Sequence, residues 1–268
     1  MERGELPARR GVRVVSMVVL APGADGRVPG FDPVAAGLPR KNLKTMTRAV
    51  QLGVAAVSQV LAGWPAWQSV PPERRGLYVG ASPQAGDPDD LAPALAALGG
   101  DRDLRAFADR AVPLIPPLWL VKGLSNNILG YASAQFDLQG DNGNWCDGRL
   151  GGAVALCNAV QAVAEGRVDL AVAGGADCLL GAEAVVGREV GEGAAFFVFV
   201  PSGGGVAEGD APLRPIDGMI DCEGMPRDDV AAGDAELGAA AVPLALAHAL
   251  SGDAREVRCG GLVVRRPA

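Results

Sequence analysis

A turn between an expected strand and an expected helix is the place where this sequence comes nearest to covalent chemistry. Residues 142–146 have the length of a short strand, and residues 149–165 form an Ala-rich helix that Gly166 ends as a C-terminal cap. A cysteine at the start of such a helix has a lowered pKa, because the positive end of the helix dipole stabilises its thiolate. The residue in that position is Arg149, so the sequence predicts a nucleophile site without its nucleophile.

The turn itself is rich in glycine. Gly148, Gly151 and Gly152 would let another chain or an acyl group approach the backbone closely. The backbone N–H groups of these glycines and of Arg149 could bind a developing oxyanion without a covalent step. Cys146 lies three residues upstream of Arg149, at the end of the strand rather than at the start of the helix. We therefore expect Cys146 to be a simply buried cysteine and not a nucleophile.

Arg149 has two interpretations. Its guanidinium could fill an acyl pocket or bind a carboxylate or phosphate, or it could be a surface arginine at a turn that has lost its use. A cation at a helix N-terminus is unfavourable by roughly a few tenths of a kcal/mol or more. We therefore expect a compensating acidic neighbour, either Asp147 or a residue of a partner protein.

The remaining reactive residues predict no metal site and no cofactor. The five cysteines are odd in number and have no paired spacing, which argues against both a disulfide framework and a zinc site. The single histidine, His248, lies in an apolar helical stretch, and we interpret it as a core or interface residue rather than a general base.

The composition restricts the class of partner. The 268 residues are 49% hydrophobic and carry a net charge of −7, which disfavours nucleic acid and an anionic membrane surface as partners. The apolar run Val14–Leu20 follows Arg9 and Arg10 as in a signal peptide, but Arg13 and Ser16 interrupt it, and we interpret it as a buried strand. No stretch approaches the ~20 apolar residues that span a bilayer. We expect a soluble, cytoplasmic protein.

Hydrophobic spacing predicts strands separated by helices, with few hairpins, and this order indicates a layered α/β domain. The expected strands are 12–20, 76–81, 142–146, 168–173 (stopped by Gly174-Gly175), a closing hairpin of 194–200 with 213–220, and 256–264. The expected helices are 41–61, 87–98, 116–136, 149–165 and 236–250.

Four stretches, in order along the chain, resemble the β-ketoacyl synthases of the thiolase-like superfamily. The segment from Gly140 to Gly175 resembles the family's nucleophile region without a gap. The other three are Leu43–Leu52, which resembles the first long helix, Ser125–Gly130, which resembles the helix before the nucleophile strand, and Gly191-Glu192-Gly193, which resembles the strand that closes the first half.

The resemblance implies a layered α/β/α thiolase-like fold that is essentially the first half of a ketosynthase. Residues 1–220 would form this N-terminal half, and residues 221–268 would be an acidic connection, a helix and a final strand, a truncated remnant of the C-terminal half. The family's cysteine falls at Arg149, and one of its two histidines falls at Asp234. The resemblance therefore implies no catalytic residue in this chain.

Arg149–Leu156 looks like the corresponding stretch of chain-length factors, which lack the cysteine and pair with an active ketosynthase to shape its acyl tunnel. The resemblance implies a heterodimer in which strand 142–146 pairs antiparallel with the equivalent strand of the other subunit. We also expect one face of the first half to be uncovered without a partner. The implied interface residues are Asn142, Gly143, Asn144, Trp145 and Cys146.

Two other functions remain open at this point. The chain could be an enzyme of altered chemistry, such as a decarboxylase or acyltransferase that uses the oxyanion-binding turn. It could also be a scaffold module that binds an acyl carrier protein, with a basic surface supplied by four side chains near the start of the first long helix. The same side chains could be no more than a solvated helix start. They are Arg40, Lys41, Lys44 and Arg48.

Overall fold

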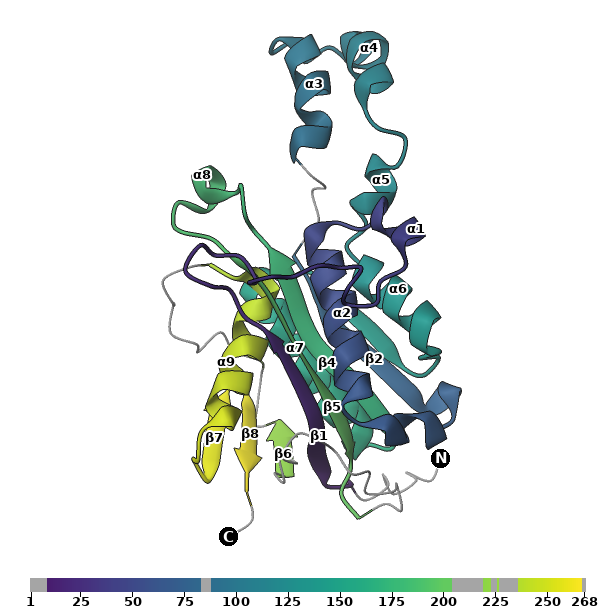
Figure 1. Ribbon diagram of the computed structural model, residues 1–268, viewed down its shortest axis with the longest axis vertical. Helices are drawn as coiled ribbons and strands as arrows, with labels where there is room; N and C mark the ends of the chain where they lie inside the picture. Colours follow the sequence, from purple (N-terminus) through teal and green to yellow (C-terminus); the bar gives the residue numbers. More distant parts are fainter. Residues whose placement is uncertain (1–8, 83–87, 204–218, 223–225, 227–235, 267–268) are drawn as a thin grey trace, which may run out of the picture.

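The protein is one mixed sheet with helices on both faces. The computed structural model describes residues 9–82, 88–203, 219–222, 226 and 236–266. Figure 1 shows helices α2 and α6 on one side of the sheet and α7 and α9 on the other. This is the layered α/β fold that the sequence predicts.

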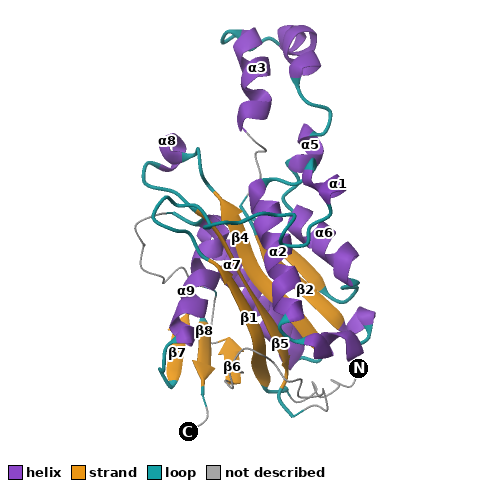
Figure 2. Ribbon diagram, viewed as in Figure 1, coloured by secondary structure: helices purple, strands orange, loops and turns teal. Residues whose placement is uncertain are grey.

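The sheet has eight strands in the order β3-β2-β4-β5-β1-β6-β8-β7 (Figure 2). Strand β2 pairs parallel with β3 and β4, and the other neighbours pair antiparallel. The strands are β1 (Val12–Leu20), β2 (Arg75–Gly80), β3 (Asn142–Trp145), β4 (Leu170–Cys178), β5 (Glu192–Pro201), β6 (Met219–Cys222), β7 (Glu256–Cys259) and β8 (Leu262–Arg265).

Each face of the sheet has its own hydrophobic core because inward and outward side chains alternate along the central strands. In β5, Phe197 and Phe199 face α7 and α9, whereas Phe196 and Val198 face α2. The α-helices are α1 (Arg40–Leu43), α2 (Arg48–Ala62), α3 (Pro88–Leu98), α4 (Leu104–Ala106), α5 (Trp119–Lys122), α6 (Asn127–Phe136), α7 (Gly148–Ala164), α8 (Glu183–Val186) and α9 (Ala241–Ser251).

Two of the expected long helices are broken. The helix predicted over 41–61 is α1 followed by α2, because Thr47 is extended and accepts a hydrogen bond from the Val50 N–H, which starts a new helix there. The helix predicted over 116–136 is α5 followed by α6, with the break at Gly123–Asn126. The apolar spacing is continuous across both breaks, so periodicity alone does not reveal them.

The strand predictions fail where pairing is not local. The expected hairpin of 194–200 with 213–220 is wrong, because β1 lies between β5 and β6; residues 213–218 lie outside the described part of the chain. The expected single strand 256–264 is a hairpin, β7 with β8, whose turn residues Gly260 and Gly261 both have positive φ. The pairing of strands that are far apart in the sequence cannot be inferred from the hydrophobic pattern of each segment alone.

Gly174 and Gly175 do not stop a strand, contrary to the prediction. Both lie in the middle of β4, which runs on to Cys178. At Gly174 a Cβ would overlap the carbonyl oxygen of Ala195 on β5. The glycines are therefore required by close packing and not by a turn.

The segment from α3 to α5 extends beyond the end of the sheet (Figure 1). It carries large apolar side chains that are mostly exposed, including Leu104 at 82% and Leu120 at 71% of their full accessible area. Others on the same segment are Leu95, Phe107, Val112, Leu114, Leu118, Val121 and Leu124. We call this segment, residues 88–124, the apolar arm.

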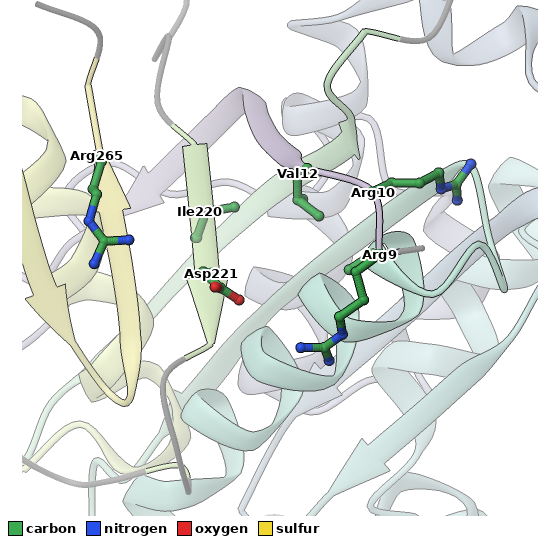
Figure 3. A pocket seen from close by; sticks show the side chains of 8 residues that line it. Arg9, Arg10, Val12, Ile220, Asp221 and Arg265 are labelled. Carbon is green, nitrogen blue, oxygen red and sulfur yellow. The ribbon is translucent and has the colours of Figure 1, made fainter. Parts of the chain in front are cut away.

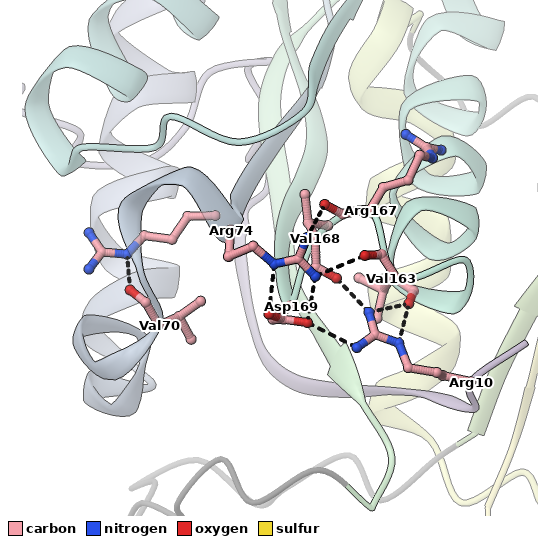
Figure 4. A network of polar contacts seen from close by, with 9 residues as sticks. Arg10, Val70, Arg74, Val163, Arg167, Val168 and Asp169 are labelled. Carbon is pink, nitrogen blue, oxygen red and sulfur yellow. Dashed lines mark hydrogen bonds and ion pairs between the residues drawn. The ribbon is translucent and has the colours of Figure 1, made fainter. Parts of the chain in front are cut away.

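A carboxylate at the start of β4 ties the N-terminal strand to the rest of the sheet. Asp169 accepts hydrogen bonds from Arg74 Nε at 2.8 Å and Arg10 Nη1 at 2.9 Å (Figure 4). Arg10 also donates to the carbonyl of Val163 and Arg74 to that of Gly166, both at 2.8 Å. Cations are favourable there because α7 ends with its negative dipole end.

Replacing Asp169 with asparagine should lower the free energy of unfolding by about 1–3 kcal/mol at neutral pH, the range for hydrogen bonds to charged groups. The bond from Arg74, and after it the bond from Arg10, lowers the pKa of Asp169 to about 2. The stabilisation by the Asp169 carboxylate is therefore complete above the unfolded-state pKa of about 4. It is lost as the pH falls toward about 2. Urea unfolding of both proteins across this range measures the difference, which should shrink on acidification.

Glu256→Gln is the matched control, since Glu256 forms exposed ion pairs with Arg258 and Arg265. It should change the free energy of unfolding much less than Asp169→Asn does, because exposed ion pairs are screened by solvent. An Asp169→Asn effect as small as that of the control, or one unchanged at low pH, would contradict the assignment.

Candidate functional site

Of the three parallel strands, β2 and β3 end together at one end of the sheet, and β4 runs three residues further. The last residue of β2, Gly80, is level with Trp145 on β3 and with Gly175 on β4. The carboxyl ends of parallel strands are the usual place for a site in an α/β sheet, because the loops that follow them converge there. The turn predicted at residues 147–149 lies at this end of the sheet, where the chain passes from β3 into α7.

Arg149 is the second residue of α7, as the sequence predicts. The chain leaves β3 at Trp145 and enters the helix through Gly148, whose φ of 49° is in the left-handed region that favours glycine. Asp147, which precedes the helix, makes no capping hydrogen bond with its side chain. The side chain of Arg149 is 17% exposed, so the charge is carried in a largely buried position.

The carboxylate that balances Arg149 is Glu236. Arg149 Nη1 lies 3.4 Å from both oxygens of Glu236, whose side chain is 8% exposed, and Arg188 forms a second ion pair with the same carboxylate. The Gly238 N–H donates to it at 2.9 Å. We expected the acidic neighbour to be Asp147 or to come from a partner; the structure places a distant residue of the same chain there.

The C-terminal segment, residues 236–266, is fixed at this position by its backbone. The N–H of Glu236 donates to the Glu189 carbonyl at 2.7 Å, and its carbonyl accepts from the Gly191 N–H at 3.0 Å. The short 3-10 helix η5 (Gly238–Ala240) then packs against β4 and the start of α7. The segment is thus held at its start, next to the turn.

The glycines of the turn make room for this segment. A Cβ at Gly152 would overlap the carbonyl oxygen of Ala239, and so would one at Gly175. Gly151 packs against the Trp145 carbonyl, and Gly80 against the backbone of Gly151 and Gly152. The close approach that the sequence predicts for another chain or an acyl group is made, at Gly152, by residues of the same chain.

A buried aspartate lies at the same end of the sheet. Asp177, at the end of β4, is 1% exposed and accepts hydrogen bonds from the Ser82 hydroxyl and from the Ala239 N–H, the latter at 3.0 Å. Burial raises the pKa of Asp177 against the lowering effect of these bonds. Sequence reasoning missed both Ser82 and Asp177, although Asp177 lies only two residues after the stretch that resembles the nucleophile region.

Cys146 follows the last residue of β3 and precedes the helix, where the sequence predicts it. It is half-buried, in contrast to the expectation that it is simply buried, and the Asn144 side-chain amide lies 3.2 Å from its sulfur. Among the described strands β3 is an edge strand that pairs with β2 alone. Asn142 is exposed and Gly143 half-buried, and the Trp145 ring stacks on Tyr78 with 6.3 Å between the ring centroids.

The four basic residues of the proposed carrier-protein surface divide into two groups. Arg40, Lys41 and Lys44 are exposed in and just after α1. Arg48 instead donates to Glu192 at 2.9 and 2.6 Å, and Glu192 is fully buried. Burial would raise the pKa of Glu192, but the bond from Arg48 helps to lower it.

The other predicted residues lie away from this edge or outside the described chain. His248 is exposed on α9, so it is not a core histidine, and the other interpretation, an interface histidine, stays a prediction. Asp234 lies outside the described residues. Within the described ranges, no group of His, Cys, Asp and Glu side chains could hold a metal ion, and no helix is long and apolar enough to cross a bilayer.

A cavity of about 270 Å³ lies near the other end of α7, between Ala164 and β6 (Figure 3). Arginines 9, 10 and 265 and Asp221 contribute to its wall. Since α7 has 17 residues and a helix rises 1.5 Å per residue, the cavity is roughly 25 Å from Arg149. It is not part of the site at the strand ends.

Glu236→Ala should lower the free energy of unfolding by about 2–4 kcal/mol, because it leaves the buried Arg149 guanidinium and the Gly238 N–H without their carboxylate. Adding Arg149→Ala should recover part of this loss by removing the charge that Glu236 balances, and a double-mutant cycle of urea unfolding measures the coupling. Glu189→Ala, an exposed neighbour, is the control and should stay within about 0.5 kcal/mol of the parent. Strictly additive losses would contradict the pairing.

The sequence and the fold have known relatives. A sequence model of the β-ketoacyl synthase N-terminal domain matches residues 16–195, which is more than half of the chain. No curated protein matches the sequence. This extent of the domain match shows the family.

Three solved structures share the fold. A structure titled as a type II PKS acyl-carrier protein in complex with its ketosynthase bound to the hexaketide has a TM-score of 0.59 at 16% identity, over 72% of this chain and 63% of that one. The ishigamide ketosynthase/chain length factor gives 0.54 at 19%, over 73% and 59%, and a β-ketoacyl synthase from Burkholderia phymatum STM815 gives 0.56 at 20%, over 72% and 59%.

This chain spans about three fifths of the length of those structures. At these identities the likeness establishes the fold, and it includes proteins described as a ketosynthase and as a ketosynthase/chain length factor. Together with the domain match, the ordered strand ends and the turn at Arg149, it identifies the chain as a member of the β-ketoacyl synthase family, with the family's N-terminal domain at residues 16–195.

Proposed function

We propose that this chain is a non-catalytic, chain-length-factor-like subunit that pairs with an active ketosynthase and helps to shape its acyl tunnel. The observation that carries the proposal is the pair of Arg149 and Glu236 at the start of α7. The resemblance puts the family's cysteine at this position, and here it holds a guanidinium fixed to a buried carboxylate. A covalent acyl intermediate has no attachment point there.

The pair also removes the electrostatic advantage of the site. A thiolate or an oxyanion gains from the positive end of a helix, whereas here the Glu236 carboxylate already lies beside that end. The carbonyl of Ala239 further packs against Gly152. Both observations count against a decarboxylase or acyltransferase that binds an oxyanion in this turn.

Three surfaces support a protein partner. The edge of β3 is available for strand pairing, and the apolar arm exposes leucines beyond the sheet. Our expectation of a wholly uncovered face is corrected, because helices cover both faces and α7 is mostly buried. The third surface is a half-exposed stripe on α7. It is formed by Leu150, Val154, Asn158 and Gln161.

The role as a carrier-protein scaffold has narrower support. Lysines 41 and 44 and Arg40 could attract an acidic partner, and one related structure is described as a carrier-protein complex. Arg48 cannot contribute to that surface while it is paired with Glu192. Carrier-protein binding is therefore proposed as a secondary property of the same subunit.

Arg149→Cys should restore little or no condensation of acyl thioesters, because the resemblance assigns the two histidines to the half of the family fold that is largely missing here. Measurement of condensation product together with alkylation by iodoacetamide separates a reactive thiol from a working site. Glu236 should raise the pKa of the new thiol, so Arg149→Cys with Glu236→Gln should alkylate faster than Arg149→Cys alone. Condensation clearly above the parent's background would overturn the proposal.

Co-expression with an active ketosynthase encoded nearby should give a stable 1:1 complex by light scattering, and an acyl thioester label should be found only on the partner. Asn142→Lys should weaken the complex at least tenfold, because a charge on an edge strand blocks pairing. His248→Lys, exposed on α9 over the opposite part of the sheet, is the control and should leave it intact. Label on Cys146, or a monomer that binds carrier protein alone, would contradict the subunit role.

A further inference from the structure

Three of the five cysteines meet in one core, where α7 packs against the strands at the C-terminal end of the sheet. Cys222 on β6 and Cys259 on β7 are both level with Leu262 on β8, one on each side of it. Cys157, on α7, belongs to the same core cluster. These residues are far apart in the sequence, so only the sheet order brings them together.

The contacts single out one pair of thiols. Helix α7, which carries Cys157, packs directly against β6, which carries Cys222, and the two side chains hydrogen-bond to each other. Cys157 also lies 3.7 Å from the carbonyl of Gly260, whereas Cys259 donates to the carbonyl of Val242 at 3.8 Å, on α9. None of the five cysteines, all of which lie in the described part of the chain, is in a disulfide.

The two thiols have different chemical characters. The hydrogen bond from Cys157 lowers the pKa of Cys222, and the charge of Arg9 and the side chain of Gln161 act in the same direction, against burial and Asp221. The same bond and burial raise the pKa of Cys157. Cys222 is therefore the nucleophile of the pair, and Cys157 holds the proton.

Cys222 is also the reachable member of the pair. It is half-buried, whereas Cys157 is 1% exposed. Its neighbours Ile220 and Asp221 line the 270 Å³ cavity together with Arg9 (Figure 3). The cavity therefore lies beside the part of β6 that carries Cys222.

We propose that Cys157 and Cys222 form a reversible disulfide in response to a hydroperoxide. The Cys222 thiolate attacks the peroxide oxygen, breaks the O–O bond and becomes a sulfenic acid, with the distal oxygen leaving as hydroxide or alkoxide. The sulfur of Cys157 then attacks that of Cys222, the S–S bond forms, and the sulfenic hydroxyl leaves as water with the Cys157 proton. Two thiols and one peroxide give one disulfide, one alcohol or water, and one water.

The bond would join two parts of the chain that are otherwise held by packing. It would link α7, which begins at the turn of Arg149, to β6 next to the hairpin of β7 and β8. A cross-link over such a long loop stabilises mainly by restricting the unfolded chain. This inference does not depend on the proposed subunit role.

Treatment of the full-length chain with equimolar hydrogen peroxide, followed by alkylation and peptide mapping, tests it. The number of alkylated cysteines should fall from five to three, a peptide joining Cys157 to Cys222 should appear, and dithiothreitol should reverse both changes. The oxidised protein should unfold at a higher temperature. Five alkylated cysteines after oxidation, or a cross-link that involves Cys259 or a second molecule, would overturn the proposal.

Single substitutions make the assignment specific. Cys157→Ser should stop the reaction at a sulfenic acid on Cys222, which dimedone traps, whereas Cys222→Ser should show neither adduct nor cross-link. Cys259→Ser, in the same core, is the matched control and should form the cross-link normally. The principal measurement is made on the parent protein, so the proposal can still be tested if a variant fails to fold.

Discussion

The ion pair of Arg149 and Glu236 holds the C-terminal segment against the turn at the start of α7. Arg149 brings a positive charge to the positive end of a mostly buried helix, which is unfavourable on its own. Glu236 supplies the opposite charge from 87 residues further along the chain, while its carboxylate also accepts the Gly238 N–H. The pair therefore links the turn at the start of α7 to the C-terminal segment.

The other contacts at this end of the sheet are arranged around the same ion pair. With Glu236 fixed against residues 189–191, η5 packs against β4 and the start of α7, and Ala239 reaches both Asp177 and the glycine at 152. A Cβ at that glycine would push the segment away. The features that resemble those of a thiol nucleophile, a helix start with glycines close behind it, thus serve here to hold the chain's own C-terminal segment. This supports a retained structural role over accidental loss of one residue.

Local pattern was sufficient where neighbours in sequence decide the structure. The strand Val12–Leu20, the glycine-capped helix α7 and the position of Arg149 follow from the sequence, and the resemblance gave the family. Pattern failed at Thr47, where one side-chain cap splits a continuous apolar repeat, and at β5 and β6, which β1 separates. A cap depends on one residue's backbone angles, and strand order on contacts between distant segments, so neither is contained in hydrophobic periodicity.

The sequence by itself determined that an arginine stands at the start of this helix, where the resemblance puts a nucleophile, and that it requires an acidic neighbour, because residue identity and helix polarity fix both. Only the tertiary structure decided which neighbour it is, since Asp147 is adjacent in sequence but Glu236 is adjacent in space. The same holds for Cys157 and Cys222, which have no paired spacing yet share a core. Long-range proximity follows from how the strands are ordered in the sheet, and that order is set by packing on both of its faces at once.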